Sequence, residues 1–237
     1  MIKKGVSYFK IEILGKGSGV HMKMTTGVIK GYGEIDVPYT RLSQGENAEG
    51  IAILLPGLGY SVQAPLLHYS TGIYLQKGFD VLHVNYQYTN ADYERFSVEE
   101  VDDALKYDVN KVIDKVLQDH TYPHIHIVAK SFGTLSLGAE SARESLQEAK
   151  FIWLTPLLKE DEIFQAMLDS KQEGLCIIGD GDRHYDEGRF HELKTNQRLE
   201  VHLIKGANHS LEHDFNVLDS ISTHKEIMSI IKAFSEA

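Results

Sequence analysis

The feature that most constrains the fold is a series of short apolar runs that alternate with longer segments of helical character. Most of these runs are apolar at every position rather than at every second one. Strands of this kind are typical of a parallel sheet that is covered by helices on both faces. The runs cover residues 51–55, 80–84, 124–129, 151–154, 175–178 and 199–204.

Helical periodicity is clearest between two of these runs. Across 97–120 apolar residues recur at three- and four-residue spacing, and Ser97 followed by Glu100 predicts a capping box at the start. A second helix is expected over 217–234 and a short one over 160–170. Because strand and helix alternate, right-handed crossovers and a mostly parallel central sheet follow. We therefore predict an α/β fold with helices on both faces of the sheet.

The N-terminal part follows a different pattern. Alternating segments at 6–14 and 27–37 predict antiparallel strands joined by a glycine-rich turn, and the polar stretch 41–50 predicts a loop. No repeat, low-complexity tract or linker divides the sequence. A chain of 237 residues is long enough to bury one sizeable core, so we expect residues 1–237 to form a single domain.

Charge and cysteine content argue against several classes of partner. Lys and Arg number 24 and Asp and Glu 34, a net charge of -10, which repels nucleic-acid phosphates and anionic lipid head groups. Cys176 is the only cysteine, so no intrachain disulfide or cysteine-based metal cluster can form. The N-terminus alternates like a strand, and no window approaches the ~20 apolar residues that cross a bilayer. We expect a cytoplasmic protein without nucleic-acid or membrane partners.

The strongest local signal is the sequence Ala129-Lys130-Ser131-Phe132-Gly133, which lies between an apolar run and a predicted helix. Small residues two positions before and after a serine suit a sharp strand-to-helix turn, because larger side chains there would collide with neighbouring elements. Such a turn presents the serine hydroxyl above the sheet edge, where the helix N-terminus favours negative charge. Taken alone, the motif also fits an ordinary turn serine that caps a helix.

A glycine-rich turn follows the first apolar run. In Pro56-Gly57-Leu58-Gly59, small residues allow a backbone N–H to point into a cleft without obstruction. Enzymes of acyl transfer need two such donors for the oxyanion, and the N–H groups of Leu58 and Phe132 are the candidates. A turn that binds no ligand is the alternative.

Two further signals lie after the last two runs. Asp180 and Asp182 follow 175–178, and a carboxylate at the carboxyl end of a parallel strand lies where α/β sheets place their sites. His209 follows 199–204 and could lean over the sheet edge to reach the serine. A solvated loop histidine is the alternative, since the sequence contains 12 histidines.

Taken in chain order, oxyanion turn, serine, acid and histidine each follow their own predicted strand. In this order the sequence resembles the α/β-hydrolase superfamily from residue 51 onward. Departures are Ala129 where glycine is usual and Pro56 where histidine is common. The Gly-x-x-Asp pattern of that superfamily favours Asp182 over Asp180 as the acid.

The resemblance implies a small serine hydrolase. Ser131 would be the nucleophile, His209 the general base and Asp182 the group that orients the imidazole. A carboxylic ester or thioester is the expected substrate, cleaved through an acyl-enzyme. A catalytically silent binding protein, an acyltransferase and a C–C hydrolase of the same fold remain open. The oligomeric state is left open as well.

The remaining expectations concern the cleft. The interval 155–174 has room for one short helix and no large lid, so the cleft should be open. Its lining is expected to include Tyr60, Leu157 and Leu158, beside the two residues of the oxyanion hole. Lys130 is expected to turn away from the cleft and pair with a carboxylate, with attraction of an anionic substrate as the alternative. No cofactor and no metal are expected.

Overall fold

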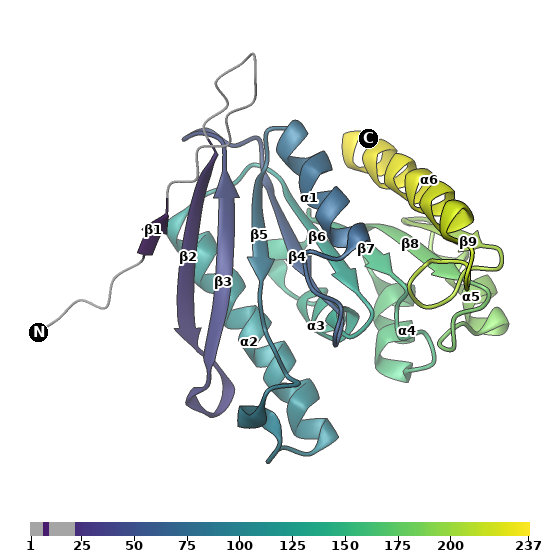
Figure 1. Cartoon of the computed structure of the whole chain (residues 1–237), viewed down its shortest axis with the longest axis horizontal. Helices are drawn as coiled ribbons and strands as arrows, with labels where there is room; N and C mark the ends of the chain where they lie inside the picture. The colour runs from purple at the N-terminus through teal and green to yellow at the C-terminus, as the bar shows by residue number, and fades with distance from the viewer. Residues whose placement is uncertain (1–6, 10–21) are drawn as a thin grey trace, which may run out of the picture.

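The computed structural model describes residues 7–9 and 22–237, and its centre is one nine-stranded sheet (Figure 1). The order of strands across the sheet is β1-β2-β3-β5-β4-β6-β7-β8-β9. The strands are β1 (Ser7–Phe9), β2 (Lys23–Lys30), β3 (Asp36–Ser43), β4 (Ile51–Leu55), β5 (Asp80–Val84), β6 (Ile125–Lys130), β7 (Lys150–Leu154), β8 (Glu173–Gly179) and β9 (Leu199–Ile204).

Strands β4 to β9 are parallel to one another, and β1 to β3 continue the sheet in antiparallel fashion. Both features confirm the predicted fold class. After β5 the chain crosses back over β4 to form β6 on its other side, so the strand order reverses at β4. Ligands of open α/β sheets bind at the carboxyl ends of strands beside such a reversal. The topology therefore favours a ligand site at the carboxyl ends of β4 and β6.

Helices cover both faces of the sheet, as predicted. In Figure 1, α1 and α6 lie side by side on one face, whereas the contacts α2–α3, α3–α4 and α4–α5 link the helices of the other. The helices are α1 (Pro65–Gln76), α2 (Val98–Asp119), α3 (Gly133–Glu140), α4 (Asp161–Asp169), α5 (Glu187–Leu193) and α6 (Val217–Glu236).

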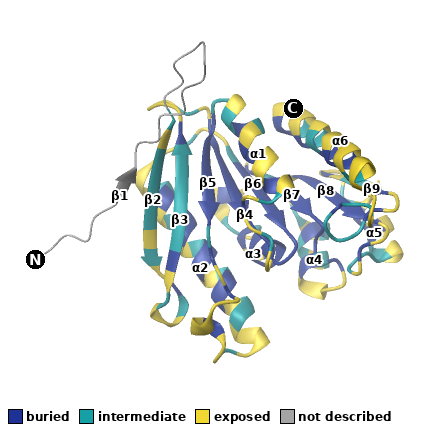
Figure 2. Cartoon of the chain, viewed as in Figure 1, coloured by how far each residue is buried: buried dark blue, intermediate teal, exposed yellow. Residues whose placement is uncertain are grey.

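The core consists of two apolar layers, one on each side of the sheet. Figure 2 shows that the central strands are buried, whereas the outer surfaces of the helices are exposed. Alternate residues of β4 belong to opposite layers: Ile53 packs with the α2–α5 side and Leu54 with the α1–α6 side. Neither residue has any exposed surface. A strand that is buried on both faces must be apolar at successive positions, which explains the unbroken apolar runs.

The N-terminal prediction is partly wrong. The expected strand 27–37 contains the end of β2, a 3-10 turn at Tyr32–Glu34 and the start of β3. Gly33 in that turn has φ of 59°, a left-handed conformation that glycine adopts readily. The expected loop 41–50 begins later, because β3 continues to Ser43, which pairs with Lys23 of β2. The expected glycine-rich turn before β2 lies outside the described residues.

The predicted helices are confirmed with small shifts of their ends. Ser97 caps α2 in a capping box: its hydroxyl accepts the Glu100 N–H at 3.2 Å, and the Glu100 carboxylate accepts the Ser97 N–H at 2.8 Å. Between β7 and β8 the chain holds α4, whose Ile163 and Met167 are buried in the core. Within the described residues, no helix has the length and apolar character needed to span a membrane.

Candidate active site

Ser131 occupies the turn between β6 and α3, at the carboxyl edge of the sheet. Its φ of 52° lies in the left-handed region, which residues other than glycine adopt at a cost of roughly 1–3 kcal/mol. The turn is held by the Ser131 N–H, which donates to the Leu154 carbonyl at 2.9 Å, and by the Thr134 N–H, which donates to the Ser131 carbonyl at 2.8 Å. Ser131 thus lies in a sharp strand-to-helix turn, as the sequence motif predicts.

The small residues around Ser131 let three segments approach closely. A Cβ on Gly133 would lie 2.5 Å from the Leu55 carbonyl oxygen, so α3 reaches the end of β4 only with glycine there. A Cβ on Gly57 would lie 3.2 Å from the Ser131 Cβ. Ala129 is completely buried in β6, where its single methyl group is accommodated. The glycine turn after β4 therefore packs directly against the serine.

Two short hydrogen bonds connect Ser131, His209 and Asp182. The distance from Ser131 Oγ to His209 Nε2 is 2.7 Å, and that from His209 Nδ1 to Asp182 Oδ2 is also 2.7 Å. In the tautomer that carries the proton on Nδ1, His209 donates to the carboxylate and accepts from the serine. The structure thus brings together three side chains that are distant in the sequence, in the order that proton transfer from a serine requires.

Asp182 is held in its charged form. Its side chain has no exposed surface, and burial works to raise its pKa. Hydrogen bonds from the His209 ring and from the His184 N–H, at 2.8 Å, outweigh burial, so the pKa of Asp182 lies below its ordinary value. A carboxylate in this state can orient the imidazole and stabilise its protonated form.

Asp180, the alternative acid, has a different contact. It is exposed, and its Oδ1 accepts the N–H of Gly206 at 2.5 Å. Beside it, a Cβ on Gly179 would lie only 2.0 Å from the Ala207 carbonyl oxygen, so the end of β8 is packed tightly against the histidine loop. Asp180 thus connects the loop after β8 to the histidine loop, whereas Asp182, at the Gly-x-x-Asp position, contacts the ring of His209.

The histidine loop is braced by its own side chains. The Asn208 Oδ1 accepts the N–H groups of Ser210 and Glu212, at 2.8 and 3.2 Å, and its Nδ2 donates to Asp214 at 2.7 Å. The His224 ring lies 3.4 Å from the Ser210 carbonyl oxygen and connects the loop to α6. These contacts limit how far His209 can move.

The expected oxyanion donors lie at the two turns beside Ser131. Within residues 22–237, neither the Leu58 N–H nor the Phe132 N–H has an acceptor in the protein. The Tyr86 hydroxyl donates to the Pro56 carbonyl, and the Tyr60 N–H donates to the Gly57 carbonyl at 3.1 Å. Those bonds fix the turn that carries Leu58.

A cavity of about 190 Å³ lies beside the glycine turn. Two segments line it, Pro56 to Ser61 and Tyr86 to Thr89. The second follows β5 and was not among the predicted site residues, although its position directly after a predicted strand could have indicated it. Tyr88 from this segment packs edge-on against Phe132, with ring centroids 5.8 Å apart.

Of the residues expected to line the cleft, Leu58 and Tyr60 line this cavity, whereas Phe132, Leu157 and Leu158 do not. Leu157 is half-buried against the core, and Leu158 is completely buried within it. For Leu158 the expectation is therefore not met, because its side chain packs beneath the loop rather than into the cleft.

Lys130 also departs from expectation. Its side chain is 2% exposed and makes no ion pair within residues 22–237. Its Nζ instead donates to the backbone carbonyl of His209 at 2.9 Å and lies 4.8 Å from the centroid of the Tyr60 ring. The lysine next to the serine is thus part of the site's framework.

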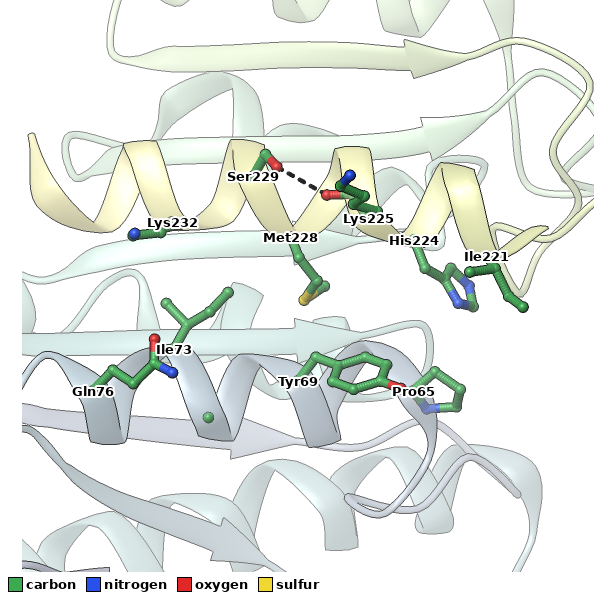
Figure 3. A pocket seen from close by; sticks show the side chains of 11 residues that line it. Pro65, Tyr69, Ile73, Gln76, Ile221, His224, Lys225, Met228, Ser229 and Lys232 are labelled. Atoms are coloured by element: carbon green, nitrogen blue, oxygen red, sulfur yellow. Dashed lines mark hydrogen bonds between the residues drawn. The ribbon is translucent and has the colours of Figure 1, made fainter. Parts of the chain in front are cut away.

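A larger groove, of about 590 Å³, lies between α1 and α6 (Figure 3). In Figure 3 Met228 of α6 points toward Ile73 and Tyr69 of α1, and Pro65 and Ile221 lie at one end of the groove. None of Ser131, His209 and Asp182 lines this groove. The described residues contain no group of three or more His, Cys, Asp or Glu side chains placed to hold a metal, and Cys176 is buried in the core.

Solved structures similar to this chain include several described as α/β hydrolases or esterases. They include a candidate α/β hydrolase of unknown function from Agrobacterium tumefaciens, at 19% identity and a TM-score of 0.70, with 89% of this chain and 94% of that chain covered. An esterase from Pyrococcus furiosus shares 14% identity, with a TM-score of 0.70 and coverages of 96% and 98%. An α/β serine hydrolase without lid from Xanthomonas campestris shares 14% identity, with a TM-score of 0.62 and coverages of 100% and 96%.

No protein-family model matches this chain, and no curated protein matches it in sequence. The structural similarity, which spans nearly the whole chain, shows that it has the α/β-hydrolase fold. Identities this low establish the fold and not the activity, which must be argued from the site.

Proposed function

We propose that the protein is a serine hydrolase that cleaves a small carboxylic ester or thioester through Ser131, His209 and Asp182. The observation that carries the proposal is the pair of 2.7 Å hydrogen bonds that link these side chains in order. The strained backbone of Ser131 and the two unpaired N–H groups beside it give further support. Structural neighbours described as esterases and serine hydrolases are consistent with it.

In the first half of the reaction, the Ser131 oxygen attacks the carbonyl carbon while His209 Nε2 takes its proton. Asp182 stabilises the imidazolium that forms. The carbonyl oxygen becomes an oxyanion, which accepts hydrogen bonds from the N–H groups of Leu58 and Phe132. When the intermediate collapses, the carbon–oxygen or carbon–sulfur bond breaks, and His209 donates its proton to the leaving alcohol or thiol.

In the second half, water attacks the acyl-enzyme. His209 takes one proton from the water, and a second oxyanion forms in the same place. Its collapse returns the proton to the Ser131 oxygen and releases the carboxylic acid. The water supplies the hydroxyl group of the acid, so each turnover consumes one water and leaves the enzyme unchanged.

The cleft favours a small substrate. The cavity beside the glycine turn is lined by Leu58 but by none of Ser131, His209 and Asp182, and its volume of about 190 Å³ is below the roughly 300–1,000 Å³ of typical ligand pockets. Helix α4, which occupies the interval where a lid would be inserted, buries its apolar residues in the core on the side of α3. A short acyl group beside Tyr88 and Leu58, with an exposed leaving group, suits this arrangement.

Covalent labelling with a fluorophosphonate probe tests the proposal. The wild type should be labelled, Ser131→Ala should not, and Ser229→Ala, which alters an exposed serine on α6, should be labelled like the wild type. A series of p-nitrophenyl esters should then give the highest kcat/KM for the shorter acyl chains. An unlabelled wild type would indicate a silent binding protein. Labelling without ester or thioester hydrolysis would favour the acyltransferase or C–C hydrolase.

A further inference from the structure

Lys130 is a buried cation directly beside the candidate nucleophile. With 2% of its surface exposed, it is among the largest fully buried side chains of the molecule. Removing an ammonium group from water is costly unless hydrogen bonds or charges compensate for the lost hydration. The buried Lys130 ammonium must therefore have contacts that compensate for its lost hydration.

The contacts of Lys130 join three segments of the site. Its backbone ends β6 directly before the serine turn, its Nζ donates to the His209 carbonyl at 2.9 Å, and its ammonium lies 4.8 Å from the Tyr60 ring centroid. The lysine stem also approaches the glycine turn, since a Cβ on Gly57 would lie 3.4 Å from the Lys130 Cδ. One side chain thus bridges the serine turn, the histidine loop and the oxyanion turn.

We propose that Lys130 is a positioning residue that fixes the backbone of His209, and through it the imidazole, within hydrogen-bond reach of Ser131. The bridge is short, because it runs from the residue before the nucleophile to the carbonyl of the base itself. A charged donor strengthens such a bond roughly twofold over a neutral one. The inference rests on the proposed function, since it concerns the same proton transfer.

The protonation of Lys130 should then affect activity. Burial lowers the pKa of Lys130 to about 8; Asp182 and Glu212 act to raise it, and Arg183 lowers it further. Burial raises the pKa of Tyr60 to about 12, so this ring stays neutral while the lysine titrates. Below pH 8 the ammonium makes a charge-assisted bond and a cation–π contact. Above it, the neutral amine makes a weaker bond and loses the cation–π contact.

The test compares the full-length wild type with Lys130→Met between pH 6 and 10. With p-nitrophenyl butyrate, the wild type should lose kcat as the pH rises through about 8. Lys130→Met should lower kcat roughly 10- to 100-fold, a range typical of misplaced catalytic groups, leave KM nearly unchanged and lack the alkaline decline. Fluorophosphonate labelling rates should follow the same pattern.

Lys150→Met is a matched control. Lys150, at the start of β7, also donates to a backbone carbonyl, that of Phe234 at 3.4 Å, and lies 5.2 Å from the Phe234 ring centroid. It is far from the serine turn, which follows the opposite end of the neighbouring strand. Its loss should alter stability without changing kcat or the pH profile.

Lys130→Arg provides a second variant if the methionine variant folds poorly. Arginine stays charged across the range, so it should recover part of kcat and show no alkaline decline. A folded Lys130→Met variant with the kcat and pH profile of the wild type would overturn the inference. A Lys130→Arg variant that is as inactive as a folded Lys130→Met variant would overturn it as well. A wild type that neither hydrolyses esters nor is labelled would instead refute the proposed function.

Discussion

At the scale of single residues, the site depends on a backbone conformation of Ser131 that the Cβ atom of this serine disfavours. Ser131 has φ of 52°, where an L-residue is disfavoured because its Cβ crowds the backbone. The hydrogen bonds to Leu154 and Thr134 hold it there. The strained backbone of Ser131 thus lowers the stability of the fold at the place where its hydroxyl is exposed to a substrate. Such local strain is common at functional sites.

This strain predicts an unusual order of stability. Ser131→Gly should be more stable than Ser131→Ala by about 0.5–1 kcal/mol, because relief of about 1–2 kcal/mol of strain exceeds the entropy cost of glycine. At Ser229, inside α6, the order should reverse, since glycine in a helix costs about 1 kcal/mol relative to alanine. Urea unfolding of the four variants measures both differences. The same order at both positions would contradict the strain argument.

The two neighbouring aspartates allow a second prediction at this scale. Asp182→Asn should lower kcat/KM by about 10⁴-fold, as loss of this carboxylate does in the best-studied triad. Asp180→Asn should retain most of the activity, because Asp180 contacts Gly206 and not the imidazole. Steady-state kinetics with a short-chain ester, and labelling rates, distinguish them. Comparable losses in both variants would show that the loop contact and the histidine contact matter equally.

At the scale of elements, the site lies where the first residue of α3 packs against the end of β4. The close approach is possible because Gly133 lacks a side chain. Helix α1 also contains a glycine in its interior, Gly72, but a Cβ there would meet nothing within 4 Å. One glycine is required by packing, whereas the packing around the other leaves room for a side chain.

Alanine at these two positions should have opposite effects. Gly133→Ala should destabilise the protein by roughly 1–3 kcal/mol, because its methyl group would overlap the Leu55 and Pro56 carbonyl oxygens. It should also lower kcat, since the turn that carries Leu58 must move. Gly72→Ala should stabilise by roughly 0.5–1 kcal/mol without affecting kcat. Thermal unfolding and ester hydrolysis check both, and Gly133→Ala with wild-type stability and kcat would refute the packing account.

Elements with strong local signals could be predicted from the sequence, and those without could not. The parallel strands were recognised because burial on both faces leaves unbroken apolar runs, and α2 because Ser97 and Glu100 form a capping box. Helix α1 has no side-chain cap at Ala64, so nothing local marks its start except Pro65. The turn within 27–37 is not among the predictions, although Gly31 and Gly33 could have indicated it.

The same distinction holds for the candidate site. Ser131, Asp182 and His209 were recognisable because each follows a predicted strand, and parallel strands end at one edge. The contact of Lys130 with the His209 carbonyl could not be predicted, because the two residues are 79 positions apart and a backbone carbonyl acceptor is not marked by any residue type. Leu158 was misplaced because sequence does not show which of two adjacent leucines turns into the core.

At the scale of the whole molecule, one sheet connects every layer. β3 pairs with β5, so the antiparallel N-terminal strands belong to the same hydrogen-bonded ladder as the strands that carry the site. The two apolar layers share those strands and cannot be exposed independently. We therefore expect the described parts of the chain to unfold together.

The single tryptophan makes this prediction testable. Trp153 lies in β7 with no exposed surface, between the neighbouring strands β6 and β8. Urea unfolding followed by its fluorescence should coincide with unfolding followed by far-ultraviolet circular dichroism, as for a two-state domain. Separate midpoints would indicate that part of the fold is an independent unit.

The last strand of the sheet has a consequence for solubility. β9 pairs with β8 on one side, and within the described residues no further strand follows it. A free strand edge can recruit strands of other molecules and start aggregation. β9 carries the carboxylate of Glu200, which lies 2.5 Å from the His202 ring nitrogen Nε2, and Lys205 follows the strand directly. Charges along this edge disfavour strand addition, which would help the protein stay dispersed at high concentration.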